Sequence, residues 1–264
     1  MKRMILCALA ALSLCACGPS LVILHFNDTH SHLDPDRSGA LEGHAGAIER
    51  AALVDSIRNV YGEDRVLLLH AGDFSQGTAY FTLFSGEVED KVINALGYDC
   101  MTFGNHEFDN GIEEITKRAE RLSPRLVCCN IDLQGRLGEI VKPCTIIEKG
   151  GIRVGIIGVE AELQESLTRS VADQLTELPL YPTVQKWADY LRKEKCRLVI
   201  VLSHRGYEED AEIAANTRGV DMIIGGHTHT FVEDIKYVPN LDGKSVGIVT
   251  DGCWGYEMGK LEVR

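Results

Sequence analysis

The 264-residue sequence lacks two spacing patterns that mark common cofactor sites. No two cysteines form a CxxC pair, so a zinc ribbon is not indicated. No GxGxxG segment follows an apolar run, which argues against a dinucleotide-binding turn. Six cysteines follow Cys17 and leave fifteen pairings open, although several stand in apolar runs, where a buried free thiol is the commoner state. They are Cys100, Cys128, Cys129, Cys144, Cys196 and Cys253.

Basic residues are scarce relative to acidic ones. The sequence has 27 Lys and Arg against 39 Asp and Glu, which gives a formal net charge of −12. A surface this acidic repels phosphate backbones, so binding of a nucleic-acid polymer is disfavoured. Hydrophobic residues make up 45% of the chain, enough for a core, so general disorder is not expected. The acidic protein should also repel a small anionic substrate unless bound cations reverse the charge locally.

Long apolar runs are almost absent. Residues 4–14 form one, preceded by Lys2 and Arg3, which is too short to span a bilayer and has the length of a signal-peptide core. The run ends in Leu-Cys-Ala-Cys, which resembles a bacterial lipobox, so we expect residues 1–16 to be a signal peptide and Cys17 to be lipidated. Cleavage without a lipid is the alternative. The pattern predicts an exported protein of the bacterial periplasm or cell envelope, held by a lipid anchor.

Five other apolar segments are short, and each ends in polar residues able to bind a metal. The segments span residues 21–26, 65–70, 100–103, 198–202 and 222–224. The polar residues that follow them are Asp28, His30, Asp73, Asn105, His106, His204, His227 and His229. Because ligands gather at the carboxyl ends of strands in open α/β sheets, we expect these side chains to meet in one site.

Helical patterns alternate with these apolar segments. Amphipathic spacing predicts helices over residues 46–61, 111–122, 183–195 and 208–216. In the first, the predicted apolar face consists of Ile48, Ala51, Ala52, Leu53, Ile57 and Val60. Residues 145–148 and 153–159 flank a Gly-Gly pair and predict a hairpin, which makes the sheets mixed. The alternation predicts a single α/β domain with buried sheets.

The donor atoms in this set are carboxylate oxygens, one amide and imidazole nitrogens, with no thiol. Such donors suit Mn²⁺, Zn²⁺ or Fe, without choosing among them. The set exceeds what one tetrahedral ion needs, but it fits two adjacent ions that share a bridging carboxylate. Two such ions would outweigh the charge of two aspartates and a hydroxide, so the site could hold a phosphate and activate water.

Each of these features has an ordinary structural explanation when taken alone. Asp28 and His30 could belong to a surface turn, and Asp73 follows a glycine as turn residues often do. Asn105 could cap a helix, and His204 could be a hydrogen-bonded core histidine. The metal interpretation depends on finding all the features at strand ends in one chain.

The order of these features resembles the metallophosphoesterase domain of the 5′-nucleotidase family, within the calcineurin-like phosphoesterases. The matching segments are LHFNDTH at residues 24–30, AGD at 71–73, GNHEFD at 104–109, SH at 203–204 and GGHTH at 225–229. They cover nearly all of residues 21–264, which we expect to form one metallophosphoesterase domain. The resemblance implies a four-layer α-β-β-α sandwich of two packed mixed sheets flanked by helices.

The resemblance also implies a role for each residue. Asp28, His30 and His229 would hold one metal ion, Asn105, His204 and His227 would hold a second, and Asp73 would bridge both. His106, polarised by Asp109 one helical turn away, would stabilise the transition state or assist the leaving oxygen. Asn105 and His106 would contact the substrate phosphate, and a hydroxide bridging the ions would attack a nucleotide monoester. Arg205 is a further candidate for a phosphate contact because it stands beside His204, although an arginine on the surface is the ordinary alternative.

The sequence departs from the family at its end. Residues 255–263 resemble the last part of the metallophosphatase domain, and we expect the nucleoside-binding domain of typical 5′-nucleotidases to be missing from this chain. We therefore expect the catalytic centre, but not nucleotide specificity, to be transferable. The chain could be a small 5′-nucleotide phosphohydrolase, or a catalytic subunit that needs a separate nucleotide-binding chain. Hydrolysis of UDP-sugars, 2′,3′-cyclic phosphodiesters or thiosulfate esters, and metal binding without catalysis, are further alternatives.

Overall fold

The computed structural model of the protein describes residues 18–264. The strands are β1 (Leu21–Phe26), β2 (Val66–Ala71), β3 (Cys100–Thr102), β4 (Arg125–Leu126), β5 (Cys144–Lys149), β6 (Ile152–Val159), β7 (Leu198–Ser203), β8 (Met222–Ile224), β9 (Lys236–Pro239), β10 (Ser245–Val249) and β11 (Gly259–Val263). The helices are α1 (Ala47–Tyr61), α2 (Ala79–Phe84), α3 (Glu87–Leu96), α4 (Gly111–Arg121), α5 (Gly135–Ile140), α6 (Leu163–Ser166), α7 (Arg169–Ala172), α8 (Leu180–Lys193) and α9 (Tyr207–Ala215).

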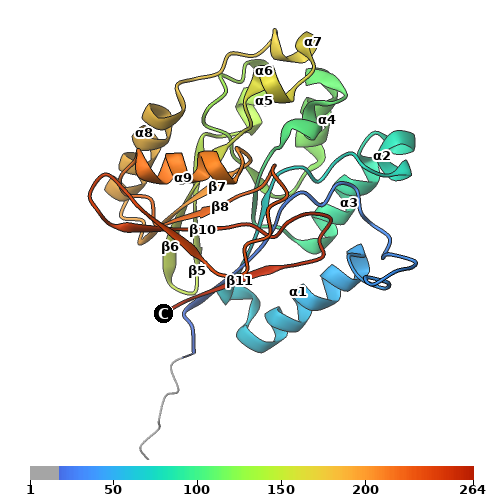
Figure 1. Cartoon of the computed structure of the whole chain (residues 1–264), viewed down its shortest axis with the longest axis horizontal. Coiled ribbons are helices and arrows are strands. Elements are labelled where there is room, and N and C mark those ends of the chain that lie inside the picture. The colour runs from blue at the N-terminus through green and yellow to red at the C-terminus, as the bar shows by residue number, and fades with distance from the viewer. Residues whose placement is uncertain (1–17) are drawn as a thin grey trace, which may run out of the picture.

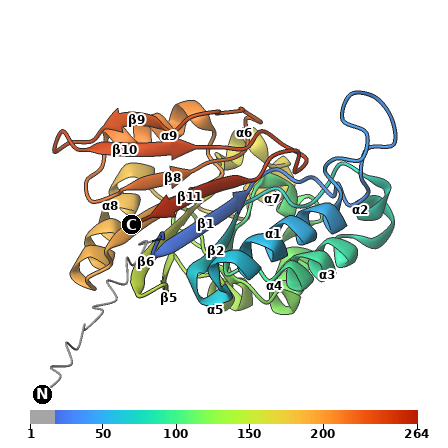
Figure 2. The same cartoon turned by 90° about the horizontal axis from the view of Figure 1, so that it is seen from below.

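These elements form four layers, with two mixed sheets between two groups of helices. In Figure 2, α1, α3 and α4 lie on one side of the sheets, and α8 and α9 lie on the other. The expected α/β sandwich of two mixed sheets flanked by helices is confirmed. The predicted signal peptide, residues 1–16, and the predicted lipid site at Cys17 lie outside the described residues.

The two sheets are parallel in their centres and antiparallel at some edges. The first has the order β11-β1-β2-β3-β4, in which only β11 runs antiparallel to its neighbour. The second has the order β5-β6-β7-β8-β10-β9, with antiparallel pairing of β5 and β9 at its two edges. The loops after β1, β2 and β3 therefore leave the first sheet at one end, and those after β7 and β8 leave the second together (Figure 1).

The apolar strands are buried on both faces. In β1, Leu21 and Ile23 point into the core between the sheets, while Val22, Leu24 and Phe26 pack in the core under α1, α3 and α4. Ile200 and Leu202 of β7 face the same inter-sheet core, and the alternate residues of β7 face α8 and α9. Side chains alternate because successive residues of a strand point to opposite faces. Continuous apolar runs are thus the sequence pattern of strands covered on both sides.

The predicted hairpin is present as β5 and β6, joined by Gly150 and Gly151. Both glycines have positive φ, at 58° and 73°, which a two-residue type I′ turn requires at its central positions. The turn reverses the chain so that β5 becomes the antiparallel edge of the second sheet. Predicted strand and hairpin positions in this part of the chain therefore agree with the structure.

All four predicted helices are present, with ends that differ from the prediction by up to three residues. The largest difference is at α8, which begins at Leu180 and carries Pro182 in its first turn, where a missing N–H costs nothing.

The predicted apolar face of α1 is correct only in part. Ala51 and Ile57 pack against the core beside the buried Val54, as predicted for the first two. Ile48 and Val60 are instead 80% and 74% exposed. Arg50 is buried on this helix, and its guanidinium donates to the Ala45 and Trp254 carbonyls.

No helix within residues 18–264 is long and apolar enough to span a bilayer. In the same range the six cysteines are free thiols, and all but Cys144 are buried.

Candidate metal centre

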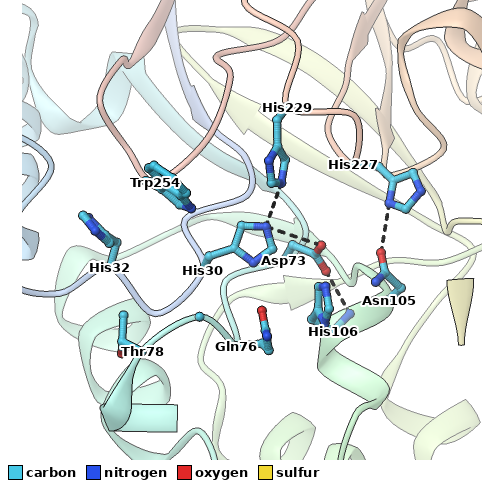
Figure 3. Close-up of a pocket in the computed structure, with 11 residues that line it drawn as sticks. His30, His32, Asp73, Gln76, Thr78, Asn105, His106, His227, His229 and Trp254 are labelled. Atoms are coloured by element: carbon cyan, nitrogen blue, oxygen red, sulfur yellow. Dashed lines mark hydrogen bonds and ion pairs between the residues drawn. The ribbon is translucent and has the colours of Figure 1, made fainter. Parts of the chain in front are cut away.

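Five loops bring the predicted ligands together beside one pocket. Asp28 and His30 follow β1, Asp73 follows β2, and Asn105 and His106 follow β3, all from the first sheet. The loops after β7 and β8 bring the remaining predicted ligands from the second sheet, namely His204, His227 and His229. Figure 3 shows the imidazoles of His30 and His229 turned toward each other, with Asp73 beside them and His227 facing Asn105.

The donor atoms of these residues lie within a few ångströms of one another. Asp73 Oδ2 is 3.0 Å from His204 Nε2 and 3.8 Å from His30 Nε2. Asp28 Oδ1 is 3.5 Å from His229 Nε2. His30 Nε2 and His229 Nε2 are 2.8 Å apart, and His227 Nδ1 is 2.9 Å from Asn105 Oδ1.

Three overlapping groups of side chains each have donor atoms within 4.8 Å of one another. They are Asp28 with His30 and His229, His30 with Asp73 and His106, and Asp73 with His204 and His227. Asp73 and His30 each belong to two groups, so the groups form one continuous cluster. The predicted ligands therefore come together in space, and His106 lies beside them.

The cluster combines deep burial with negative charge. Asp28, Asp73 and His204 are at most 2% exposed, and none of the residues that line the pocket of about 500 Å³ is a lysine or arginine. Burial alone would lower the pKa of His204, but Asp73 and Asp28 outweigh it and hold that pKa well above its ordinary value. Burial would raise the pKa of Asp73, but the charge of nearby His204 holds it below its usual range. The site thus favours positive charge.

Most of these residues have an unusual backbone conformation. Asp28, His30, Asp73, His227 and His229 have φ between 45° and 77°, in the left-handed region that residues other than glycine rarely adopt. Such conformations cost about 1–3 kcal/mol each and persist where surrounding contacts fix them.

Glycines allow the loops to come close enough for these contacts. A Cβ on Gly104 would lie 2.6 Å from His204 Nε2, and one on Gly226 would lie 2.9 Å from Asp28 Oδ2. Both distances are too short for a side chain, so glycine lets the backbone approach the donors.

The buried carboxylate of Glu107 fixes the loops after β2 and β3. Its two oxygens accept backbone N–H bonds from Asp73 at 2.8 Å, Ser75 at 2.9 Å and Gly104 at 2.7 Å. The sequence prediction did not include Glu107 among the site residues. Its position three residues after Gly104, at the start of a helical turn, is that of a capping-box carboxylate and was the available signal.

A second set of bonds orients Asp28. Asn27 Nδ2 donates to Asp28 Oδ2 at 2.6 Å and to the Gly252 carbonyl at 2.7 Å. The backbone N–H of His227 donates to the same Asp28 oxygen at 2.9 Å. Loops from both sheets and from the segment after β10 therefore hold one carboxylate.

The predicted pair of His106 and Asp109 is formed. His106 Nδ1 is 2.9 Å from Asp109 Oδ2, and the backbone N–H of His106 donates to Asp73 Oδ1 at 2.9 Å. The hydrogen bond that the His106 ring donates to the Asp109 carboxylate raises the pKa of His106. His106 and Asn105 line the pocket, which is where a substrate contact requires them to be.

Arg205 is placed differently. Its guanidinium donates to Glu177 Oε1 at 2.6 Å and is not among the residues that line the pocket. The structure therefore brings Arg205 to an acidic partner rather than to the donor cluster.

One segment matches the sequence motif of another class of hydrolase but lacks the geometry that this motif requires. Residues 243–247, Gly-Lys-Ser-Val-Gly, match the letters of the GxSxG serine-hydrolase turn. Ser245 begins β10, whose antiparallel partner is β9, whereas a nucleophilic elbow needs a turn from a strand into a helix. The string is part of a hairpin strand.

The residues present fit divalent cations. The observation is a buried cluster of carboxylate and imidazole donors in which Asp28 and Asp73 face no lysine or arginine in the pocket lining. Oxygen and nitrogen donors of this kind hold Zn²⁺, Mn²⁺ or Fe. Two mixed sheets with such a cluster at their common edge define the class of α/β metallophosphatase folds.

Comparison with known proteins identifies the family. The sequence profile of the calcineurin-like phosphoesterases matches residues 21–231. The chain belongs to the calcineurin-like phosphoesterase family.

Several relatives carry the name 5′-nucleotidase. The probable 5′-nucleotidase of Treponema pallidum is 34% identical over 81% of this chain and 37% of its own length. The bovine 5′-nucleotidase is 34% identical over 97% of this chain and 48% of its own length. The structure of a 5′-nucleotidase precursor from Thermus thermophilus superposes with a TM-score of 0.85 and 32% identity, over 92% of this chain and 51% of that one. The chain thus spans about half the length, or less, of the proteins it matches.

Replacing Glu107 tests whether its carboxylate keeps the loops after β2 and β3 in the position that metal binding needs. In Glu107→Gln the amide has one acceptor oxygen, so it cannot receive all three backbone N–H bonds, and its own N–H groups would face donors. We expect Mn²⁺ affinity, measured by titration calorimetry, to fall about 10- to 100-fold. Glu113→Gln, on the exposed side of α4, is the matched control and should bind as the unmodified protein does. Equal Mn²⁺ affinity in both variants would show that the hydrogen bonds to Glu107 are not needed for metal binding.

Proposed function

We propose that the protein is a binuclear metal-dependent phosphohydrolase that acts on phosphate monoesters of nucleotides. The observation that supports this most is the convergence of the donor side chains from five strand ends on one cluster, part of which lines the pocket. The relatives named 5′-nucleotidase support the substrate class. The acidic net charge of −12 is compatible with an anionic substrate, because cations in the cluster would reverse the charge where the phosphate binds.

The cluster divides into two ligand sets in this proposal. Asp28, His30 and His229 would hold one cation, and Asn105, His204 and His227 would hold the other, with Asp73 between them. Two divalent cations supply charge for the phosphate and lower the pKa of water enough to make it a nucleophile near neutral pH. Asn27, Glu107 and the backbone of His227 keep the donors in place by the hydrogen bonds described above.

His106 would act on the phosphoryl group or on the leaving oxygen. Its Nδ1 is bound to Asp109, so Nε2 is the ring nitrogen available to the substrate. The Asp109 carboxylate favours the protonated ring, which can donate a hydrogen bond to an oxygen that gains negative charge. Asn105, next to it in the pocket lining, would contact the same phosphate.

A second possibility is that catalysis on nucleotides needs the region that makes up the rest of the relatives. The chain matches only 37% and 48% of the two 5′-nucleotidases compared above. In that case the other half, on a separate chain, would supply nucleoside binding. Turnover of the chain alone, compared with turnover after addition of such a domain, distinguishes the two possibilities.

Two substitutions separate metal binding from turnover. His106→Ala removes a side chain that belongs to neither proposed ligand set, so we expect kcat for AMP to fall about 10²- to 10⁴-fold while metal content stays the same. Asp73→Asn weakens the shared ligand and should lower metal content and activity together. Activity is measured on AMP, UDP-glucose, a 2′,3′-cyclic nucleotide and an aryl phosphate with Mn²⁺ or Zn²⁺. Folded, metal-loaded protein that hydrolyses none of them would refute the proposal.

We also propose that the protein is exported and anchored through Cys17. The support is the basic start, the apolar run over residues 4–14 and the cysteine that follows Ala16. A Cys17→Ser variant should lose incorporation of labelled palmitate and detergent-phase partitioning, and globomycin should block processing of the unmodified protein. Labelling that persists in Cys17→Ser would contradict the assignment.

A further inference from the structure

A tryptophan stands on the rim of the metal pocket. Trp254 is 42% exposed and lines the pocket together with His30, His229 and His32. Its ring stacks with the His32 imidazole, with centroids 5.7 Å apart and planes 20° from parallel. Figure 3 shows this pair on one flank of the pocket, on the opposite side from His227 and Asn105. We call Trp254 and His32 the aromatic platform.

The backbone of Trp254 is held by hydrogen bonds to the loop after β1 and to α1. Its N–H donates to the Asp28 carbonyl at 2.7 Å, and its carbonyl accepts from Arg50 Nη1 at 3.3 Å. Its φ is 62°, which is an outlier for a bulky residue. Such a conformation persists only where the surroundings enforce it, and it is concentrated at functional sites. These contacts hold the backbone of residue 254 next to that of Asp28, one of the proposed ligands.

Burial does not account for the presence of tryptophan here. The side chain belongs to none of the buried core clusters of residues 18–264. The contacts that fix the loop use backbone atoms of residue 254, so any residue could make them. The indole itself offers an exposed aromatic face to the pocket, and aromatic faces of this kind stack on nucleobases.

We infer that the aromatic platform binds the base of the nucleotide while the phosphate lies at the metal cluster. The inference rests on the function proposed above and adds a base-recognition element within this chain. The pocket of about 500 Å³ is lined by Trp254 and His32 at one flank and by Asn105 and His106 near the cluster. Both parts of a nucleotide therefore face one continuous cavity, whose size is typical of small-molecule sites.

Gln76 and Thr78 line the cavity beside the platform and give it polar groups (Figure 3). Stacking is tolerant of base identity because every base has a π face. The platform should therefore separate nucleotides from phosphate esters without an aromatic ring more strongly than it separates one base from another.

A pair of substrates that differ only by the base tests the inference. AMP and ribose 5-phosphate carry the same phosphate ester, and only AMP can stack. In Trp254→Ala we expect the ratio of kcat/KM for AMP to that for ribose 5-phosphate to fall about 5- to 150-fold. Trp254→Phe should retain most of the ratio, and Trp187→Phe, on α8, should leave it unchanged. An unchanged ratio in Trp254→Ala would overturn the inference while leaving the hydrolase proposal intact.

Fluorescence gives a second measurement that does not need turnover. The sequence has two tryptophans, so Trp187→Phe leaves Trp254 as the only indole, and Trp254→Phe leaves only Trp187. We expect AMP to quench the first variant in a saturable manner, ribose 5-phosphate to leave it unchanged, and AMP to leave the second variant unchanged. Quenching without hydrolysis would support the platform and refute the proposed activity. Absence of quenching at AMP concentrations that saturate hydrolysis would refute the platform.

Discussion

Two buried aspartates in one cluster of imidazoles are the interaction on which the rest of this structure depends. Asp28 and Asp73 are 0% and 2% exposed, and the pocket lining offers them imidazoles but no lysine or arginine. Burying two neighbouring carboxylates is expensive, because charge loses its hydration in a low-dielectric interior and the two charges repel each other. A divalent cation is the partner that satisfies such a pair, and it also makes the pocket attractive to phosphate. The same two residues that add to the acidic net charge would thus create a local cationic site.

The fold provides this site by bringing together the ends of strands from two sheets. Parallel strands of each sheet end at the same edge, so their loops can meet above the inter-sheet core. The loops then turn sharply, with left-handed backbone at Asp28, Asp73 and His227, and with glycines where chains nearly touch. The cost of these conformations is offset by buried hydrogen bonds that Glu107 accepts and Asn27 donates. Rigidity of the cluster is therefore a property of contacts between distant segments.

The sequence predicted the fold class and the grouping of the donors, because both depend on local patterns. A strand that is apolar throughout and is followed by Asp, Asn or His can be recognised from its own residues, without knowing which strands lie beside it. Features that depend on tertiary packing could not be predicted from these local patterns. The side of α1 that faces the core includes Arg50, which bonds to the carbonyls of Ala45 and Trp254, the latter about two hundred positions away. Arg205 is similarly bound to Glu177 rather than directed at the pocket. Trp254 has no neighbouring motif, so its place on the rim becomes visible only in three dimensions.

The central claim is that the five loops form a centre for two divalent cations, and counting the ions tests it most directly. The full chain, stripped with a chelator and then equilibrated with Mn²⁺ or Zn²⁺, is analysed for bound metal by mass spectrometry after removal of free ions. The account predicts two ions per chain in the unmodified protein. Folded protein that binds one ion or none under saturating conditions would contradict it.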